Sequence, residues 1–492
     1  MEPLHIGIIA TYAALLSFIL LYSFMQLSLV IHYIRSKYLK KSGEDFDGDF
    51  IPFITVQLPI YNEKYVIERL IDAVAKFDYP KDKFEVQVID DSTDDTFDLV
   101  AAKITEVQKL GIDIKHVLRK NRQGYKAGAL ADSMDQVKGE FIAIFDADFV
   151  PTPDFLKKTI PHFRDRNVGV VQTKWEHLNE KYSMLTRLQA FGLDAHFSIE
   201  QAGRNHAKYF INFNGTAGVW RKTTIEDAGG WQSDTLTEDL DLSYRAQLKN
   251  WKFVYLESQG SPAELPANIS ALKTQQYRWT KGAAECAKKN LGKVVKAKDL
   301  KWRTKIHAVF HLMNSFLFVC IISTAVLSIP LLILKHEFPA YNEIIKYGGV
   351  FSISLIILSI FYGVSFVSGA DRKWRAVFIF PFRFFMFLSV SMGLSLHNAV
   401  AVVEGYAGRK TPFVRTPKFN SSNKKAGWIG KQYITKSLNV MTMIEGLLAC
   451  YFAFGIYLSF TYLDFGLLPY LIMLFIGFFS VYVYSIKHSF SN

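Results

Sequence analysis

The sequence predicts an α/β domain inserted between membrane-spanning α-helices. Half of the 492 residues are hydrophobic and yet 21% are charged, a mixture typical of a polar domain joined to membrane segments. Long apolar runs lie at the start of the chain and after residue 300, whereas none between 46 and 300 is long enough to span a bilayer. Within that middle stretch, short apolar strands alternate with helical patterns, which is typical of an α/β fold.

The first apolar run covers 6–33. It is longer than the core of a signal peptide and lacks a small-residue cleavage site. At ~1.5 Å per residue, a helix of this length crosses a ~30 Å hydrocarbon layer. Basic residues follow at 35–41, so the C-terminal end of the helix should face the cytoplasm. Residues 1–45 are therefore predicted to form a transmembrane helix with a basic flank.

The net charge of +12 has two interpretations. A nucleic-acid-binding protein would carry it on one face of a soluble domain. Here the basic residues cluster beside the apolar runs, at 35–41, 301–305 and 409–436, as in the cytoplasmic loops of membrane proteins. We therefore expect a lipid bilayer as partner and no nucleic acid. Three cysteines are too few for a disulfide framework.

Residues 301–492 form the predicted C-terminal membrane region, with apolar segments at 306–334, 349–369, 376–403, 438–462 and 466–486. The basic loop 409–437 should be cytoplasmic, like the domain, so an even number of crossings must separate them. Segment 376–403 contains Arg383, His397 and Asn398, which are costly at membrane depth. We expect it to be an interfacial or broken helix, which leaves five spans and a cytoplasmic C-terminus.

The domain 46–300 begins with a regular alternation of elements. We expect strands at 53–58, 84–89, 114–118 and 141–145, and helices at 64–77, 94–109 and 125–137. This alternation indicates βαβ units and a parallel sheet, in which ligands bind beyond the carboxyl ends of the strands. Asp90 and Asp91 follow the second strand, and Asp146 and Asp148 follow the fourth. No GxGxxG or Walker motif is present.

The pair Asp146 and Asp148 is a candidate metal site. If the strand persists through 148, the two side chains point to the same side, with Ala147 pointing away. Two hard oxygen ligands suit Mg²⁺ or Mn²⁺, which bridge to substrate phosphates. The alternative is the start of a turn or helix, since Val150 and Pro151 follow.

A second acidic group consists of Thr237, Glu238 and Asp239. Its alternative interpretation is a helix start, with Thr237 as the N-cap and the acids favoured by the helix dipole.

A third group lies at 275–279. On a helix, Gln275, Arg278 and Trp279 share one face. A guanidinium can bind a diphosphate and an indole can stack on a sugar ring, whereas the alternative is an amphipathic helix on the membrane surface.

These groups, in this order between membrane spans, resemble the family 2 inverting glycosyltransferases that make polysaccharides. Members of that family carry an early Asp, a DxD, a TED and a QxxRW motif. The plant-type cellulose synthase-like A and C branch is the most similar, and bacterial cellulose synthase is more distant. The resemblance covers about 50–290 and rests on VQVIDDST (86–93), NRQGYKAGAL (121–130), IFDADF (144–149), FNGTAGVWR (213–221), GGW (229–231) and QQYRW (275–279).

The resemblance implies a cytoplasmic GT-A (Rossmann-like) domain at 46–300 and a donor site within it. Asp91, with Asp90 beside it, would contact the nucleotide base. Lys126 would lie near the ribose or diphosphate. Asp146 and Asp148 would hold Mg²⁺ or Mn²⁺ with the donor diphosphate, Asp148 more directly.

The resemblance also implies catalytic and acceptor roles. Asp239, beside Glu238, would be the general base. Gln275, Arg278 and Trp279 would shape the diphosphate and acceptor site. The acceptor terminus would be lined by Phe213, Asn214, Gly215 and Thr216.

A gating loop is implied within 405–437. Residues 413–418 resemble the FxVTxK loop of bacterial cellulose synthase, so Phe413, Thr416 and Lys418 would act as the gate. Arg415 stands where that motif has Val.

The expected function is a processive inverting transferase that polymerises a β-1,4-linked mannan, glucomannan or glucan from GDP-mannose or UDP-glucose. The growing polysaccharide would leave through the membrane helices. The enzyme would lie in a bacterial inner or plasma membrane, or in the Golgi membrane of a eukaryote. One alternative is a non-processive transferase with a lipid acceptor. Another is a scaffold or transporter, which has no use for Asp146, Asp148 and Asp239.

Overall fold

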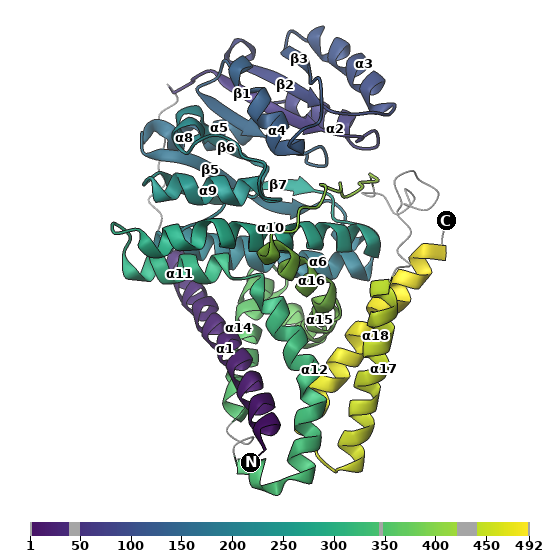
Figure 1. Cartoon of the computed structure of the whole chain (residues 1–492). Coiled ribbons are helices and arrows are strands. Elements are labelled where there is room, and N and C mark those ends of the chain that lie inside the picture. The colour runs from purple at the N-terminus through teal and green to yellow at the C-terminus, as the bar shows by residue number, and fades with distance from the viewer. Residues whose placement is uncertain (1, 39–49, 344–347, 421–439, 491–492) are drawn as a thin grey trace.

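The computed structural model describes residues 2–38, 50–343, 348–420 and 440–490. It has an α/β domain stacked on a bundle of long helices, and the N-terminus lies at the far end of that bundle (Figure 1). Helix α1 (Pro3–Tyr38) runs the length of the bundle toward the domain. The predicted insertion of an α/β domain between apolar helices is confirmed.

The domain contains a seven-stranded sheet in the order β3-β2-β1-β4-β6-β5-β7. Its strands are β1 (Ile54–Ile60), β2 (Phe84–Asp90), β3 (Asp113–Leu118), β4 (Phe141–Ile144), β5 (Val168–His177), β6 (Gly218–Arg221) and β7 (Lys252–Ala263). The first four strands are parallel, as predicted. Of the described strands, only β6 runs antiparallel to its neighbours, β4 and β5, whereas β7 pairs parallel with β5. The sheet is therefore mixed, and the prediction of a parallel sheet is wrong at β6.

Helices cover both faces of the sheet. They are α2 (Ile67–Ala75), α3 (Thr96–Gln108), α4 (Tyr125–Asp132), α5 (Phe155–Thr159), α6 (Met184–Ala195), α7 (Ala202–Ala207), α8 (Lys222–Asp227) and α9 (Glu238–Leu248). Helix α2 buries Ile67, Leu70, Ile71 and Val74, the stripe that its periodicity predicts. Every residue of β2 is buried, because helices cover both of its faces.

Helix α10 (Ile269–Lys296) lies between the sheet and the bundle (Figure 1). Its N-cap is Asn268, whose side chain accepts a hydrogen bond from the Ala271 amide at 2.8 Å. A Cβ on Gly282 would lie 2.5 Å from Thr237 Cγ2, so the glycine lets α10 press against the start of α9. This close contact brings the third motif of the sequence next to the second.

Six helices in the described part of the chain are long and apolar enough to cross a membrane. They are α1, α12 (Phe316–Glu337), the 348–368 segment that ends in α14 (Ile353–Ser368), α15 (Lys373–Gly393), α17 (Val440–Thr461) and α18 (Leu468–Phe490). The sequence predicted five spans and did not count α15. Two shorter helices, α11 (Trp302–Leu312) and α16 (Ser395–Ala407), complete the region.

Segment 376–403 is divided at Leu394 into α15 and α16. This matches the broken helix that the sequence predicted as one of two possibilities. Two of the three polar residues that argued against a span, Arg383 and His397, have partners. Arg383 lies 3.8 Å from Glu180 of the α/β domain, and His397 Nε2 lies 3.0 Å from the Lys273 carbonyl. Contacts with the domain therefore offset the cost of placing a charge in an apolar helix.

Candidate active site

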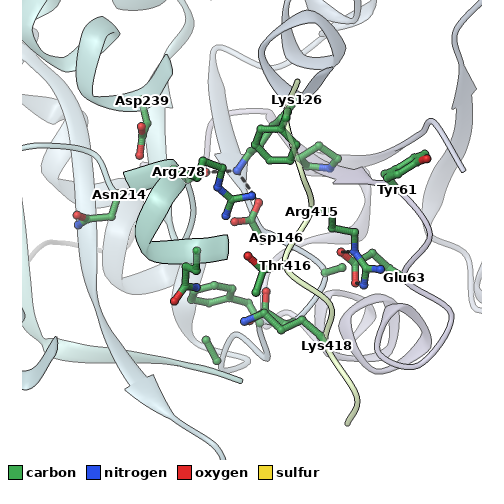
Figure 2. Close-up of a pocket in the computed structure, with 18 of the residues that line it drawn as sticks. Tyr61, Glu63, Lys126, Asp146, Asn214, Asp239, Arg278, Arg415, Thr416 and Lys418 are labelled. Carbon is green, nitrogen blue, oxygen red and sulfur yellow. Dashed lines mark hydrogen bonds and ion pairs between the residues drawn. The ribbon is translucent and has the colours of Figure 1, made fainter. Parts of the chain in front are cut away.

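A pocket of about 190 Å³ lies at the carboxyl ends of β1, β2 and β4, against α10 (Figure 2). It gathers residues from the early Asp, DxD, TED and QxxRW motifs and from the gating-like loop. The predicted site residues that line it are Asp91, Lys126, Asp146, Asp148, Asn214, Gly215, Glu238, Asp239, Gln275, Arg278, Trp279, Phe413, Thr416 and Lys418. Carboxylates, cations and indoles thus meet at the sheet edge where α/β domains bind ligands.

The two DxD carboxylates reach the pocket by a different route from the predicted one. Strand β4 ends at Ile144, and the Phe149 amide donates to the Asp146 carbonyl at 3.0 Å, which closes a turn. The strand alternation that was expected to align the side chains is therefore absent. Instead, the Asp146 amide donates to Thr216 Oγ1 at 2.8 Å, and this bond anchors the turn to the neighbouring loop.

A lysine faces each carboxylate. Lys126 Nζ lies 2.5 Å from Asp146 Oδ1 and donates to the Gly215 carbonyl at 2.8 Å, and Lys418 Nζ lies 2.7 Å from Asp148 Oδ2. Burial alone would lower the pKa of Lys126, but the charges of Asp146 and Glu238 raise it. The charged form of Lys126 is therefore favoured in the pocket.

The carboxylates of Asp146 and Asp148 fit a divalent metal that needs few protein ligands. Among the described residues, no group of three or more His, Cys, Asp or Glu is arranged to hold a metal. Mg²⁺ and Mn²⁺ are hard cations that bind to one or two carboxylates and complete their coordination with substrate phosphates and water. Asp146 and Asp148 suit that arrangement, and they do not suit a site made of protein ligands alone.

Asp239, from the second motif, has the surroundings expected of a candidate general base. Asp239 Oδ1 accepts from the Leu240 amide at 2.8 Å, and a Cβ on Gly215 would lie 3.1 Å from Oδ2. Gly215 has φ of +78°, which favours glycine at this close approach. Burial and the charge of Glu238 raise the pKa of Asp239 to about 7. A general base works best when its pKa lies near the working pH.

The alternative prediction for this motif, a helix N-cap, is confirmed for the position of Thr237 but not for a capping hydrogen bond. Thr237 is the N-cap of α9, but its side chain makes no capping hydrogen bond. Its Oγ1 lies 3.3 Å from Cys286 Sγ of α10. Glu238 and Asp239 of the first turn line the pocket, and Thr237 packs against α10.

The predicted face of α10 points into the pocket, which Gln275, Arg278 and Trp279 line together. The Trp279 ring centroid lies 6.4 Å from that of Trp175. The guanidinium of Arg278 lies 4.5 Å above the ring centroid of Phe413. This face belongs to the pocket, so the alternative of a membrane-surface helix does not describe it.

The gating-like loop lies in the pocket. Phe413 stacks on Tyr125, with ring centroids 5.7 Å apart. Arg415 Nε donates to Glu63 Oε1 at 2.7 Å, and its Nη2 donates to Glu63 Oε2. Burial raises the pKa of Glu63 to about 7 although Arg415 opposes this effect. Residues 421–437 of the predicted loop lie outside the described residues.

Three predicted site residues lie behind the pocket. Asp90 is buried, 2.8 Å from His116 Nε2, whereas its neighbour Asp91 lines the pocket and pairs with Arg119. Phe213 is a core residue, and Thr216 is buried and holds the Asp146 amide. Asp90 and Asp91 are neighbours at the end of β2 and point in opposite directions, so only Asp91 reaches the pocket.

Several lining residues were not predicted: Tyr61, Glu63, Arg122, Trp175, His177 and Glu264. Tyr61 and Glu63 directly follow β1, so the rule that ligands bind at the carboxyl ends of strands could have found them. The guanidinium of Arg122 lies 3.3 Å from the ring centroid of Tyr61. Trp175 belongs to β5, a strand that the sequence analysis did not identify.

Comparison with known proteins identifies the family of the chain. Residues 52–282 match the family described as "Glycosyltransferase like family 2". Glucomannan 4-beta-mannosyltransferase 1 of Oryza sativa subsp. japonica is 36% identical over 389 residues, which cover 76% of this chain and 70% of the relative. Glucomannan 4-beta-mannosyltransferase 2 of Arabidopsis thaliana is 34% identical over 400 residues, which cover 78% and 71%.

A solved structure supports the fold. The mannosyltransferase PcManGT from Pyrobaculum calidifontis, in complex with GDP-Man and Mn2+, aligns with a TM-score of 0.54 at 19% identity, covering 82% of this chain and 100% of that chain. The GT-A fold and the resemblance carried by the motifs are thereby confirmed. The chain therefore belongs to glycosyltransferase family 2 and is a relative of the plant glucomannan 4-beta-mannosyltransferases.

Proposed function

We propose that this protein is a multi-pass membrane enzyme that polymerises a β-1,4-linked mannan or glucomannan from GDP-mannose. One observation carries the proposal: a buried base, a DxD pair and an arginine–tryptophan helix face share one pocket on top of a bundle of apolar helices. The mannosyltransferase names of the relatives favour a mannose donor over the alternative, UDP-glucose.

The chemistry of an inverting transfer matches this set of residues. The acceptor hydroxyl attacks the anomeric carbon in a single displacement, so the enzyme needs one base and no covalent nucleophile. Asp239 takes the proton of that hydroxyl. The departing diphosphate gains negative charge, which Arg278 and Lys126 stabilise from the pocket wall. A divalent cation bound by Asp146 and Asp148 would add positive charge at the same place.

The acceptor end lies on the opposite side from the gating-like loop. Figure 2 shows Asp239 and Asn214 on one side of the pocket and Glu63 with Arg415 on the other. The indoles of Trp175 and Trp279 can stack on the rings of a sugar chain that approaches Asp239. A chain that grows here faces the membrane helices, which provide its route of secretion.

The basic segments beside the apolar helices support a cytoplasmic catalytic domain, where nucleotide sugars are available. The membrane would be the plasma membrane of a bacterium or the Golgi membrane of a eukaryote.

A donor screen tests the proposal. The purified protein in lipid nanodiscs is given GDP-mannose, UDP-glucose or another nucleotide sugar, and the release of free nucleotide is measured with and without a β-1,4-manno-oligosaccharide. Acceptor-stimulated release of GDP from GDP-mannose is expected. A clear preference for UDP-glucose would replace the mannan assignment by a glucan one, and no release from any donor would contradict the function.

The loop containing Phe413 should close over the bound donor. Replacing Phe413 and Thr416 with alanine keeps every charge of the loop but removes the ring that stacks on Tyr125 and lies under Arg278. A large loss of polymer synthesis is expected with normal membrane insertion, because closure expels water and orders the donor site. The measurement is product formation at equal amounts of inserted protein.

Val414→Ala is the matched control for this loop, since Val414 is 51% exposed and does not line the pocket. It should keep wild-type activity. Wild-type activity in the double variant as well would reduce the loop to a positive-inside anchor.

The rate should depend on pH through Asp239. Because its pKa is raised to about 7, the carboxylate is protonated and inactive below that pH and becomes a base above it. The logarithm of kcat/KM should rise with a slope approaching one below about pH 6, bend near about pH 7 and level off above about pH 8. A steady-state profile checks this expectation, and a rate that does not change across that range would contradict it.

A further inference from the structure

A polar network connects the acceptor side of the pocket with the membrane helix α1. It consists of Asn214, His196, Glu200 and Gln26, and only Asn214 was predicted as a site residue. His196 and Glu200 belong to a π-helix, His196–Gln201, inserted between α6 and α7. Such π-turns are rare and frequently occur at functional sites.

The network holds the imidazole of His196 in one orientation. His196 Nδ1 lies 2.8 Å from Glu200 Oε2, and Glu200 Oε1 accepts from Gln26 Nε2 at 2.5 Å. Burial alone would raise the pKa of Glu200, but the hydrogen bond and charge of His196 lower it to about 2. Glu200 is therefore an acceptor, and Nδ1 of His196 is the donor. The other ring nitrogen, Nε2, lies 3.4 Å from Asn214 Oδ1. An amide oxygen can only accept, so Nε2 donates in this contact and both ring nitrogens carry a hydrogen.

The amide of Asn214 presents an unused donor. Its Oδ1 accepts from Asn212 Nδ2 at 2.7 Å, and its backbone amide donates to Gln172 Oε1 at 3.0 Å. Its Nδ2 is buried and has no partner in the described part of the chain. A buried donor without a partner is costly, which indicates that a ligand or water satisfies it. The next residue, Gly215, lies against the base Asp239.

We propose that His196 is a positioning residue for the acceptor: together with Glu200 and Gln26 it orients the Asn214 amide, which donates a hydrogen bond to a hydroxyl of the terminal sugar. The inference rests on the proposed function and names the group that holds the chain end beside Asp239. The ligand is an uncharged, polyhydroxylated chain. Because Gln26 lies on α1, this orientation also depends on how α1 docks against the domain.

The test uses two variants of His196, each of which keeps the contact made by one of its ring nitrogens. In His196→Asn, the amide takes the place of Nδ1 and can still reach Glu200, whereas in His196→Gln it takes the place of Nε2 and can reach Asn214. His196→Asn should raise the KM for a β-1,4-manno-oligosaccharide about tenfold, the scale of one lost hydrogen bond. Hydrolysis of the donor by water, and the KM for the donor, should stay near wild type. His196→Gln should recover most of the acceptor affinity.

Glu257→Gln is the matched control. Glu257 also ties α1 to the domain, through Tyr33 at 3.2 Å and Lys37 at 3.0 Å, but it does not line the pocket. It should leave the acceptor KM unchanged. If it raises that KM as much as His196→Asn does, the network merely docks α1 and the proposal is wrong. Equal loss of hydrolysis and transfer in His196→Asn, or equal behaviour of the Asn and Gln variants, would also overturn it.

Direct binding keeps this test independent of the donor assignment. Tryptophan fluorescence of the full-length protein can follow manno-oligosaccharide binding without any nucleotide sugar, since Trp175 and Trp279 lie in the pocket. Weaker binding by His196→Asn but not by Glu257→Gln supports the inference even if the donor proves to be UDP-glucose. Unchanged binding by His196→Asn contradicts it, whatever the donor screen shows.

Discussion

Replacing Asp239 with asparagine should lower kcat by ~10²-fold or more, the scale of general-base catalysis, and leave the KM for the nucleotide sugar almost unchanged. Asparagine keeps the shape of the side chain and can still accept the Leu240 amide hydrogen bond, which is 2.8 Å long in the native protein. It cannot take a proton from the acceptor hydroxyl. Steady-state kinetics with GDP-mannose and an oligosaccharide acceptor measure both quantities.

A control for this variant lies two residues along the same helix. Asp241 is fully buried and pairs with Arg245 at 2.8 Å and Lys289 at 2.9 Å, away from the pocket. Asp241→Asn should lower the melting temperature, because it weakens a buried charge network, and should affect kcat little. If donor affinity falls as far as rate in Asp239→Asn, Asp239 is a binding residue and not the base.

Removing the divalent metal should abolish turnover, and Asp148→Ala should do the same. Asp146 and Asp148 are the carboxylate pair suited to Mg²⁺ or Mn²⁺ in the pocket, so alanine removes half of the protein ligands. The cationic side chains of the pocket, such as Arg278 and Lys126, then face the charge of the departing diphosphate without a metal. Activity after chelation and after return of Mg²⁺ or Mn²⁺ measures the first effect. Binding of Mn²⁺ in the presence of GDP, followed by electron paramagnetic resonance, measures the second.

The variant Lys418→Ala distinguishes the loss of the metal ligand Asp148 from the loss of the ion pair that Asp148 forms. Lys418 Nζ lies 2.7 Å from Asp148 Oδ2, so both Asp148→Ala and Lys418→Ala break this ion pair. Only Asp148→Ala removes a carboxylate, and only it should lose Mn²⁺ binding. Full turnover in the presence of chelator would contradict a metal-dependent reaction.

The first half of the domain could be predicted because its signals are local. Strands β1 to β4 are short apolar runs separated by amphipathic helices, and each was placed within a few residues of its observed bounds. Strand β6 has only four residues, Gly218–Arg221, and β7 contains Glu257, Gln259 and Gly260, so neither has the apolar run of a buried parallel strand. The sheet is mixed because β6 runs antiparallel to β4 and β5.

The site residues that belong to sequence motifs could be predicted. Residues that directly follow strands or share a helix face, such as Asp91 and Arg278, were placed correctly in the pocket. The position of Glu63 just after β1 was a usable signal, but its pairing with Arg415, 352 positions away along the chain, has no local pattern. His196 was missed for a similar reason, since its importance comes from contacts with Asn214 and Glu200 across a π-turn.

The composition of helix α15 gives two opposing indications about whether it spans the membrane. Its length and apolarity meet the requirements of a membrane span, whereas Arg383 argued against one. The contact that resolves the charge, with Glu180 at 3.8 Å, comes from the folded domain and has no signal in the apolar segment itself.

The length and linkage of the product test the proposed polymerisation most directly. The purified protein in nanodiscs is incubated with GDP-mannose and Mg²⁺ or Mn²⁺, and the product is sized and then digested with an endo-β-1,4-mannanase. Processive synthesis predicts long chains, even with acceptor in excess, that the mannanase degrades completely. Addition of a single mannose to a lipid, with no material that the mannanase can cut, would contradict it.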